Sequence, residues 1–438
     1  MENKRAIGLL FTSHVISSFA QGITMLSIPW YFASIVDETE MFGKVLALAT
    51  FISIFWSLFA GTIIDRYPRK YIFWVATLIG FLTLGGAGLY GQMNGEMPLW
   101  LVAFVFVFTF FGFNIHYPNL YAFTQQLAAK GDYGRVNSLI EILGQSTNAL
   151  SGAMGAILLS GTSADGINML GFHVFLPFDI ERWEIWEIFF LDAATYLIAA
   201  CIIPFITYRV VDGLPIDLEP IFSRLKRGWQ FLMLNRELLV FGLSTYSIFV
   251  VLLVLAQFLL PIYVDNHLHT GADVYASSEV YFAIGSLVAG LVIRRLTGGI
   301  RPAKAIAVLM VAAGLVFIGM ALTRDDLVFY LFSALLGFSN AGTRVTRVTF
   351  LFDHIPNNII GRANSIFYVY NISVRVLLIW LFSVGFFSES NNIIWAFVIC
   401  GGFILVSVVP LVLILGRLKN LKVTTLAFPG SENYSKEQ

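Results

Sequence analysis

Long apolar stretches separated by short polar segments follow one another along the whole chain. A helix needs about 20 mostly apolar residues to cross the hydrocarbon core of a bilayer, and twelve stretches reach that length. They lie near residues 7–35, 43–63, 71–91, 99–127, 137–160, 185–207, 237–262, 275–295, 303–323, 327–351, 365–387 and 393–416. The pattern therefore predicts an all-α membrane protein with twelve transmembrane helices.

Two of the connections between these stretches are longer than the others. One, at 160–184, mixes acidic and aromatic residues, and the other, at 208–236, is a polar linker between two sets of six stretches. The predicted units are an N-terminal six-helix bundle (1–207), a cytoplasmic linker (208–236), a C-terminal six-helix bundle (237–416) and a cytoplasmic tail (417–438).

Two short motifs recur at nearly the same separation in the two sets. Gly134–Ser138 (GRVNS) opens the fifth stretch, and Gly361–Ser365 (GRANS) opens the eleventh, 227 positions later. Gly61–Arg66 has a similar partner in Gly290–Arg295, 229 positions later. All four lie at helix ends on the same predicted side of the membrane. The repeat indicates two bundles related by a parallel duplication, an architecture typical of transporters that rock around a central site.

The placement of basic residues predicts the orientation in the membrane. Of the 27 Lys and Arg residues, 21 fall in segments on one side of the predicted spans. Three lie on the other side, namely Lys44, Arg182 and Arg324. The remaining three lie within spans, namely Arg344, Arg347 and Arg375. Because cytoplasmic loops carry an excess of Lys and Arg, we expect a multi-pass protein of a bacterial-type inner membrane with both termini in the cytoplasm.

Composition narrows the class of protein. Apolar residues make up 58% of the chain and charged residues 12%, with a mean hydropathy of +0.79. The net charge of zero argues against nucleic acid as a partner. The two cysteines, Cys201 and Cys400, both lie in apolar spans and predict neither a disulfide framework nor a metal cluster. No phosphate-binding loop or nucleophile elbow occurs, so we expect no enzyme activity, no cofactor and no bound metal.

The most distinctive segment is GTIIDRYPRK, residues 61–70, between the second and third spans. Its charge alone fits an ordinary cytoplasmic loop, and its glycine predicts close approach of two helices. The complete string, however, resembles the loop signature of the major facilitator superfamily. That resemblance implies a secondary transporter in which this loop docks on the second bundle to close the cytoplasmic side. The gating residues that it implies here are Gly61, Asp65, Arg66 and Arg69.

Further motifs resemble the macrolide-efflux-type branch of that superfamily. They are Ile115–Pro118, Gly134–Ser138, Leu191–Tyr196 and Gly228–Leu232. The branch implies a proton-coupled exporter of amphipathic small molecules. The chain departs from it in the fifth span, where Ser151–Ala156 keeps one glycine of the antiporter motif and no proline. The fourth span also lacks the membrane arginine of many drug–proton antiporters.

Polar residues inside the spans are the candidates for substrate binding, because an ionisable group in a bilayer is costly. Arg375 lies about eleven residues into its span, roughly 16 Å deep at 1.5 Å per residue, and its repeat mate is Asn148. A guanidinium there can hold a carboxylate or phosphate with two hydrogen bonds, or it can lock helices together through an internal ion pair. Further candidates, as ligands or as helix-packing residues, are Gln21, Asn340 and Arg344. We expect Arg347 to extend to the inner surface.

Three acidic residues are candidates for proton coupling. Glu141 lies near the cytoplasmic start of the fifth span, either as a desolvated proton carrier or paired with Arg135 or Arg362 in a cytoplasmic gate. Asp192 and Glu279 lie one to two turns below the outer surface, Asp192 on a span that the resemblance places at the periphery.

The deepest predicted charge is Arg375, and no carboxylate lies at mid-depth. Two functions follow from the sequence. One is proton-coupled export of an amphipathic small molecule by alternating access. The other is uniport or import of an anionic metabolite, siderophore or lysolipid. A non-transporting scaffold or sensor is a third reading. The expected partners are a small-molecule substrate, the proton and the lipid bilayer, and we expect a monomer.

Overall fold

The computed structural model describes residues 3–128, 132–162, 167–174, 179–208, 221–297, 300–419, 421 and 424. The first helices are α1 (Lys4–Trp30), extended by the π-helical turn η1 (Tyr31–Ile35), α2 (Thr39–Arg66), α3 (Arg69–Asn94), α4 (Leu99–Leu127), α5 (Tyr133–Ser160) and α6 (Ile185–Ile202), extended by the 3-10 turn η3 (Ile203–Phe205). Between α5 and α6 lie the short strands β1 (Ile167–Met169) and β2 (Phe172–Val174).

The remaining helices begin within the predicted linker. They are α7 (Ile221–Leu234), α8 (Arg236–Val254), η4 (Leu255–Leu259), α9 (Leu260–Tyr263), η5 (Val264–Leu268), α10 (Ala272–Thr297), α11 (Pro302–Leu322), α12 (Asp326–His354), α13 (Asn357–Phe382), η6 (Gly385–Phe387) and α14 (Ile393–Leu418). The turns η4 and η5 are π-helical, so α8 to η5 form one long interrupted helix.

The expected all-helical fold is confirmed. Within the described residues, ten helices are long and apolar enough to cross a membrane, and each matches one of the twelve expected spans. The other two expected spans correspond to α5 and α12, which have 28 and 29 residues but do not belong to those ten. The count of twelve therefore stays a prediction.

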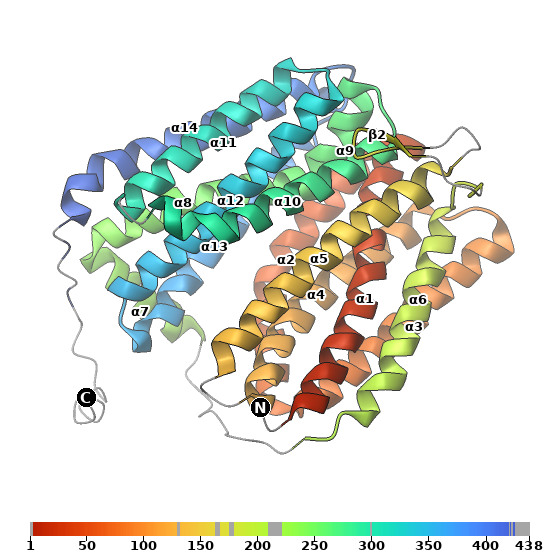
Figure 1. Ribbon diagram of the computed structural model, residues 1–438, viewed down its shortest axis with the longest axis horizontal. Coiled ribbons are helices and arrows are strands. Elements are labelled where there is room, and N and C mark those ends of the chain that lie inside the picture. Colours follow the sequence, from red (N-terminus) through yellow and green to blue (C-terminus); the bar gives the residue numbers. More distant parts are fainter. Residues whose placement is uncertain are drawn as a thin grey trace.

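The helices form two groups (Figure 1). In the first group α1 packs against α4, α5 and α6, α2 against α4, and α3 against α6. In the second group α10 packs against α12, α11 against α14, and α8 against α13 and α14. The start of α1, the end of α14 and α7 lie at the same end of the molecule, which we call the end with the termini (Figure 1). The domain boundaries at residues 207, 236 and 416 stay predictions.

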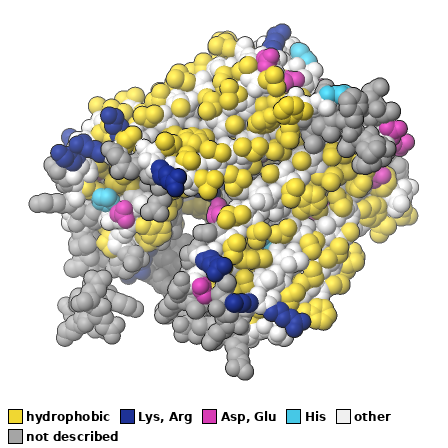
Figure 2. Space-filling view, viewed as in Figure 1, with side chains coloured by type: hydrophobic (Ala, Val, Ile, Leu, Met, Phe, Trp, Pro, Cys, Tyr) yellow, Lys and Arg dark blue, Asp and Glu magenta, His cyan; other side chains and the backbone are white. Residues whose placement is uncertain are grey.

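Apolar side chains cover much of the outer surface. Figure 2 shows hydrophobic side chains over both groups, with most of the visible Lys and Arg gathered towards the end that carries the termini. Large apolar side chains such as Phe59, Leu291 and Leu413 are 67–79% exposed in the isolated chain. Exposure on this scale fits a surface that faces lipid, because helices in a bilayer satisfy their backbone groups internally and need no polar exterior.

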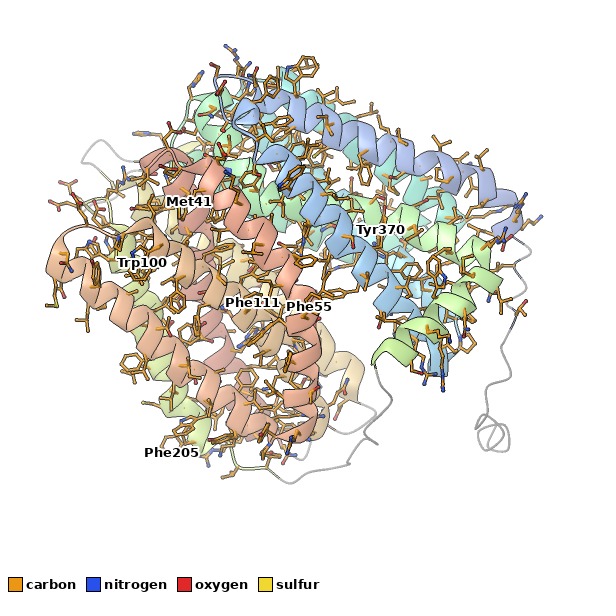
Figure 3. All side chains as sticks on the ribbon, turned by 180° about the vertical axis from the view of Figure 1, so that it is seen from behind. Met41, Phe55, Trp100, Phe111, Phe205 and Tyr370 are labelled. Atoms are coloured by element: carbon orange, nitrogen blue, oxygen red, sulfur yellow. The ribbon has the colours of Figure 1, made fainter. Side chains whose placement is uncertain are left out.

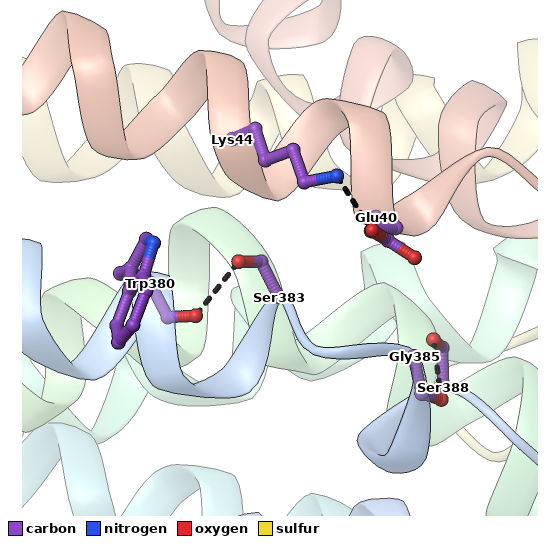
Figure 4. Close-up of polar contacts among 6 residues, drawn as sticks. All are labelled: Glu40, Lys44, Trp380, Ser383, Gly385 and Ser388. Carbon is purple, nitrogen blue, oxygen red and sulfur yellow. Dashed lines mark hydrogen bonds and ion pairs between the residues drawn. The ribbon is translucent and has the colours of Figure 1, made fainter.

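The two groups touch closely at the end opposite the termini, which we call the closed end. There α5 packs against α10 and α2 against α13. A Cβ on Gly152 would lie 3.0 Å from the Ala276 carbonyl oxygen, and one on Gly43 would lie 2.4 Å from Ser383 Cβ. Figure 4 shows the α2–α13 contact, where Glu40 and Lys44 form an ion pair of 2.5 Å on α2 beside the turn after α13.

The β-hairpin adds a second contact at the closed end. Its strands pair antiparallel, with Met169 opposite Phe172, and Leu170 and Gly171 both have positive φ (58° and 77°) as a tight two-residue hairpin turn requires. The Leu170 amide donates to Ser277 Oγ at 3.0 Å, and Tyr281 Oη donates to the Leu170 carbonyl oxygen at 2.8 Å. A loop of the first group is thereby held on α10 of the second.

Candidate functional site

A cavity of about 830 Å³ lies between the two groups of helices. The first group contributes α1, α4 and α5, and the second contributes α8, η4, α10, α12 and α13. Figure 1 shows α5 and α13 diverging towards the end that carries the termini, and Figure 2 shows the surface hollowed between the groups. The charged residues and amides in its lining are Asn114, Asn148, Gln257, Glu279, Arg344, Arg347, Asn364, Asn371 and Arg375.

Arg375, on α13, is a buried charge of this cavity without a described ion-pair partner. It is 8% exposed, and its Nε has no hydrogen-bond partner in the described part of the chain. No described carboxylate lies within ion-pair distance of its guanidinium. Asn371, one helical turn earlier on the same face, also borders the cavity with an unpaired Nδ2. Because a buried charge without a partner is costly, the pair is suited to receive an anionic or carbonyl group.

Arg347, on α12, is held inside the second group. It is 4% exposed, its Nη1 donates to the Thr245 carbonyl oxygen at 2.9 Å, and its guanidinium carbon lies 3.8 Å from the centroid of the Tyr246 ring. A carbonyl and an aromatic face together stabilise a cation away from water. The expectation that Arg347 extends to the inner surface is therefore wrong, because its side chain is buried against these two partners, with Nε left without a hydrogen bond in the described part of the chain.

Glu141 and Arg344 join the two groups near the open mouth of the cavity. Arg344 Nη2 lies 3.2 Å from Glu141 Oε2, and Tyr121 Oη donates to Glu141 Oε1 at 2.9 Å. The side chains of Arg344 and Glu141 are 41% and 49% exposed. The expected desolvation of Glu141 is not seen, because its side chain is half exposed. Its described ion pair is with Arg344, on the other group, and the expected pairing with Arg135 or Arg362 stays a prediction.

Glu141→Gln is expected to change substrate affinity by less than about threefold, because an exposed ion pair contributes about 0.5 kcal/mol. The small remaining effect should disappear at high salt, which screens exposed charges. Titration of a fluorescent substrate at low and high salt checks both points, with Glu141→Asp as the control that keeps the charge. A tenfold loss in Glu141→Gln at high salt would show that Glu141 itself binds substrate.

Glu279, on α10, borders the same cavity as Arg375. Gln257 borders it from the π-helical turn η4, and Gln257 Oε1 has no partner in the described residues. Among the charged lining residues, one is acidic and three are arginines, Arg344, Arg347 and Arg375. The cavity therefore carries excess positive charge together with one carboxyl group that can take up a proton.

Asp192 lies elsewhere, inside the first group. It is fully buried on α6, and Thr24 Oγ1 donates to its Oδ2 at 2.8 Å, while Oδ1 has no described partner. It does not belong to the lining of the cavity between the groups. Any coupling role of Asp192 must therefore act through the packing of α1 on α6.

The five predicted substrate ligands separate into two sets. Asn148, Arg344 and Arg375 line the cavity, whereas Gln21 and Asn340 do not. On α1 the cavity face holds Gly22, Met25, Leu26 and Pro29, and Gln21 lies one position off that face, turned into the first group. Asn340 lies near Gly337, where α12 packs so closely on α10 that a Cβ would stand 2.0 Å from the Phe282 carbonyl oxygen. Asn340 is half-buried on α12 and lies outside the described lining of the cavity between the groups.

The loop between α2 and α3 is anchored on its own group in this structure. Arg69 Nη1 donates to the Ala122 carbonyl oxygen on α4, and Lys70 Nζ donates to the carbonyl oxygens of Pro204 and Ile206 at 2.8 and 2.9 Å. Arg66 is exposed, with its guanidinium carbon 6.0 Å from the Tyr67 ring centroid. The Asp65 side chain lies outside the described part.

The predicted close approach of helices at Gly61 is wrong, because a Cβ there would meet no atom within 4 Å. That position, near the end of α2, is exposed. Arg135 is likewise exposed, at the start of α5. The gating roles of Gly61, Asp65, Arg66, Arg69, Arg135 and Arg362 stay predictions.

Sequence reasoning missed four amides in the described lining of the cavity, Asn114, Gln257, Asn364 and Asn371. Asn371 could have been found, because a residue four positions before Arg375 shares its helix face. Gln257 could not, since a π-helical turn shifts the helical register and apolar periodicity does not reveal it. Among the described residues, no group of three or more His, Cys, Asp or Glu is arranged to hold a metal ion.

Known proteins share this sequence pattern and fold. The chain is 24% identical over 344 residues to macrolide efflux protein A of Streptococcus pyogenes, which covers 75% of this chain and 76% of that protein. It is 25% identical over 289 residues to macrolide efflux protein A of Enterococcus faecalis, covering 64% and 80%.

Solved structures show the same fold at low identity. The POT family transporter PepTSo matches with a TM-score of 0.69 and 11% identity over 95% of this chain and 99% of that one. The nucleoside transporter NupG matches with a TM-score of 0.66 and 13% identity over 94% and 100%. The family model of the Major Facilitator Superfamily matches residues 10–379. This chain is therefore a membrane transporter, not an enzyme, and it belongs to the major facilitator superfamily.

Proposed function

We propose that this protein exports an amphipathic small molecule by alternating access, in exchange for protons. The similarity to macrolide efflux proteins supports export, and the cavity of about 830 Å³ between the two groups supplies the binding site. Its size falls in the range of small-molecule pockets. The observation that carries the proposal is the presence of Arg375 and Glu279 in one cavity, an uncompensated cation and a carboxyl group that can bind a proton.

The lining favours a substrate with an apolar body. Four phenylalanines, Phe106, Phe110, Phe113 and Phe249, line the same cavity as the charged residues, and aromatic rings pack well on flat or greasy molecules. Arg375 adds a site for a carboxylate, phosphate or carbonyl group. The substrate class that we propose is an amphiphile with an aromatic or aliphatic body and an acidic group.

Whether the substrate moves with or against the protons depends on which of its groups lies next to Glu279. A substrate whose amine pairs with the ionised carboxylate competes with the proton, which is the condition for antiport and export. A purely anionic substrate binds more tightly when Glu279 is protonated, which favours cotransport. A zwitterionic amphiphile therefore fits export, with its acid on Arg375 and its amine on Glu279. The second candidate, import or uniport of an anionic metabolite, siderophore or lysolipid, is favoured by the excess of arginines.

We assign the described conformation to the inward-open state, with both termini in the cytoplasm. The helices α5 and α13 diverge towards the end with the termini (Figure 1), and the hairpin and the α5–α10 and α2–α13 contacts hold the two groups together at the other end. Export requires these contacts to break while the mouth closes around Glu141 and Arg344. The loop at 61–70, anchored on its own group here, is the segment that we expect to dock across the closed mouth.

The test is transport in proteoliposomes with an imposed pH gradient. It uses three fluorescent probes that share the dansyl group as their apolar body and differ in charge. Dansylglycine is anionic, ε-dansyl-lysine is zwitterionic and dansylcadaverine is cationic. Export predicts that ε-dansyl-lysine moves against its own gradient when protons flow the other way. Movement of dansylglycine together with protons, or without regard to the gradient, would establish the second candidate instead. Flux equal to that of protein-free liposomes for all three probes would contradict both.

Glu279→Gln is expected to abolish the effect of the pH gradient without weakening the binding of dansylglycine, because a nearby negative charge is removed. Glutamine imitates the protonated carboxyl group, so the variant holds one state of the titration permanently. Counterflow at equal pH on both sides should persist, because it needs no proton transfer. Asp192→Asn is the matched comparison inside the first group. If transport lost its dependence on the pH gradient in Asp192→Asn but kept it in Glu279→Gln, the coupling site would be Asp192.

A further inference from the structure

A second cavity, of about 490 Å³, lies within the first group of helices between α2, α3 and α4. Its walls are mainly apolar and aromatic, including Trp56, Val75, Phe104, Phe108 and Phe111. Figure 3 shows α4, with Trp100 near its start and Phe111 further along, between α2 and α3. This volume also falls within the range of small-molecule sites.

The second cavity is separate from the cavity between the groups. The described linings of the two cavities have no residue in common, because opposite faces of α4 border them. Phe106, Phe110 and Phe113 face the cavity between the groups, whereas Phe108 and Phe111 face the second cavity. A molecule in one therefore does not touch the side chains that bind a molecule in the other.

The second cavity contains several uncharged polar groups. Thr109 borders it from α4, is 1% exposed, and its Oγ1 has no hydrogen-bond partner in the described part of the chain. Gln21 and Tyr196, 3% and 8% exposed, border it from α1 and α6. His116 also borders it, and its Nε2 lies 2.8 Å from His14 Nδ1. A buried hydroxyl without a partner is costly, so this cavity offers a hydrogen bond to a ligand.

The cavity reaches the outer surface of the first group. Tyr71, Ile79 and Phe104, which line it, are 55%, 47% and 52% exposed. These residues lie on the apolar exterior that faces lipid in a membrane. No Lys, Arg, Asp or Glu is found among its described lining residues. A ligand that reaches it from the lipid is therefore apolar over most of its surface and uncharged.

We propose that this cavity is a second binding site, which takes an uncharged amphiphile from the membrane. The apolar body of the ligand lies between α2, α3 and α4, and its hydroxyl or carbonyl group exchanges a hydrogen bond with Thr109, beside Gln21 and Tyr196. The site is independent of the transport cycle proposed above. It requires a hydrogen-bonding group on the ligand, and this distinguishes it from a groove that accepts any lipid tail.

The test is photolabelling of the full chain in nanodiscs with dodecanol that carries a diazirine in its tail. Crosslinked peptides should map to α2, α3 and α4. Dodecanol should compete for this labelling about fivefold more strongly than dodecane at equal mole fraction in the membrane, because only dodecanol supplies the missing hydrogen bond. In Thr109→Val this preference should vanish, whereas Thr109→Ser should keep it.

A pair of glycine variants separates site occupancy from general lipid contact. A Cβ on Gly112, which lines the cavity, would meet no atom within 4 Å, so Gly112→Leu fills the space and should abolish the labelling. Gly86, exposed on α3 and outside the lining, also has no atom within 4 Å of a Cβ, and Gly86→Leu should label as the parent does.

If dodecane and dodecanol competed equally for labelling of the parent protein, the cavity would accept any lipid tail. That result would overturn the proposal. Unchanged labelling in Gly112→Leu would also overturn it. Thermal unfolding of each variant in the same nanodiscs monitors folding. Thr109→Val replaces an unpaired hydroxyl by a methyl group of the same shape, so a loss of preference in that variant does not depend on misfolding.

Discussion

Arg375→Gln is expected to weaken the binding of dansylglycine by more than tenfold. The guanidinium is 8% exposed in the cavity, and its Nε has no described partner, so a bound carboxylate gains a charge-assisted hydrogen bond of about 1.5–3 kcal/mol. Arg375→Lys should lose less, since it keeps the charge but not the two-pronged geometry. Fluorescence titration of the purified protein measures both variants.

The cationic probe dansylcadaverine gives the opposite expectation, because removal of a positive charge from the cavity should leave its affinity unchanged or increase it. Arg344→Gln is the matched control, since that arginine is 41% exposed and already paired with Glu141. Its loss should be several times smaller. Equal dansylglycine affinity in the parent and in Arg375→Gln would remove the case for an acidic group on the substrate and leave an exporter of neutral or basic amphiphiles.

Helix positions could be predicted from the sequence because span length depends only on the thickness of the bilayer. The stretch expected at 99–127 is α4 at Leu99–Leu127, and the stretch at 393–416 is α14 at Ile393–Leu418. Sequence position also predicts a depth for Arg375, since 1.5 Å per residue converts position in a helix into distance. That depth stays a prediction, and the structure adds that Arg375 lines the cavity between the groups.

The direction in which each helix faces could not be predicted. Lipid tails are as apolar as a helix interface, so a span such as α4 shows no polar face, and both of its sides border a cavity. Gln21 and Gly22 are neighbours in sequence, yet Gly22 lines the cavity between the groups and Gln21 lines the second one. The Glu141–Arg344 pair joins residues 203 positions apart, and no local pattern encodes that contact.

Gly152→Val is expected to shift the protein from the described conformation towards one that is open at the closed end. A Cβ at Gly152 would lie 3.0 Å from the Ala276 carbonyl oxygen and 3.1 Å from Val280 Cγ2, and valine adds two further carbons. Overpacking of this kind costs about 1–3 kcal/mol, which corresponds to a change of roughly tenfold or more in the ratio of the two states. The cost falls on the described conformation, because separation of α5 from α10 relieves it.

Spin labels at Glu40 and Ser388, on α2 and in the turn after α13, measure this opening (Figure 4). The background variant Cys201→Ser removes the exposed thiol, and Cys400 is buried. The distance between the labels should lengthen in Gly152→Val and stay as in the parent in Gly144→Val, because a Cβ at Gly144, also on α5, meets no atom within 4 Å. If Gly152→Val kept the parent distance while remaining folded, α5 and α10 would not separate during transport, and the closed end would have to open elsewhere.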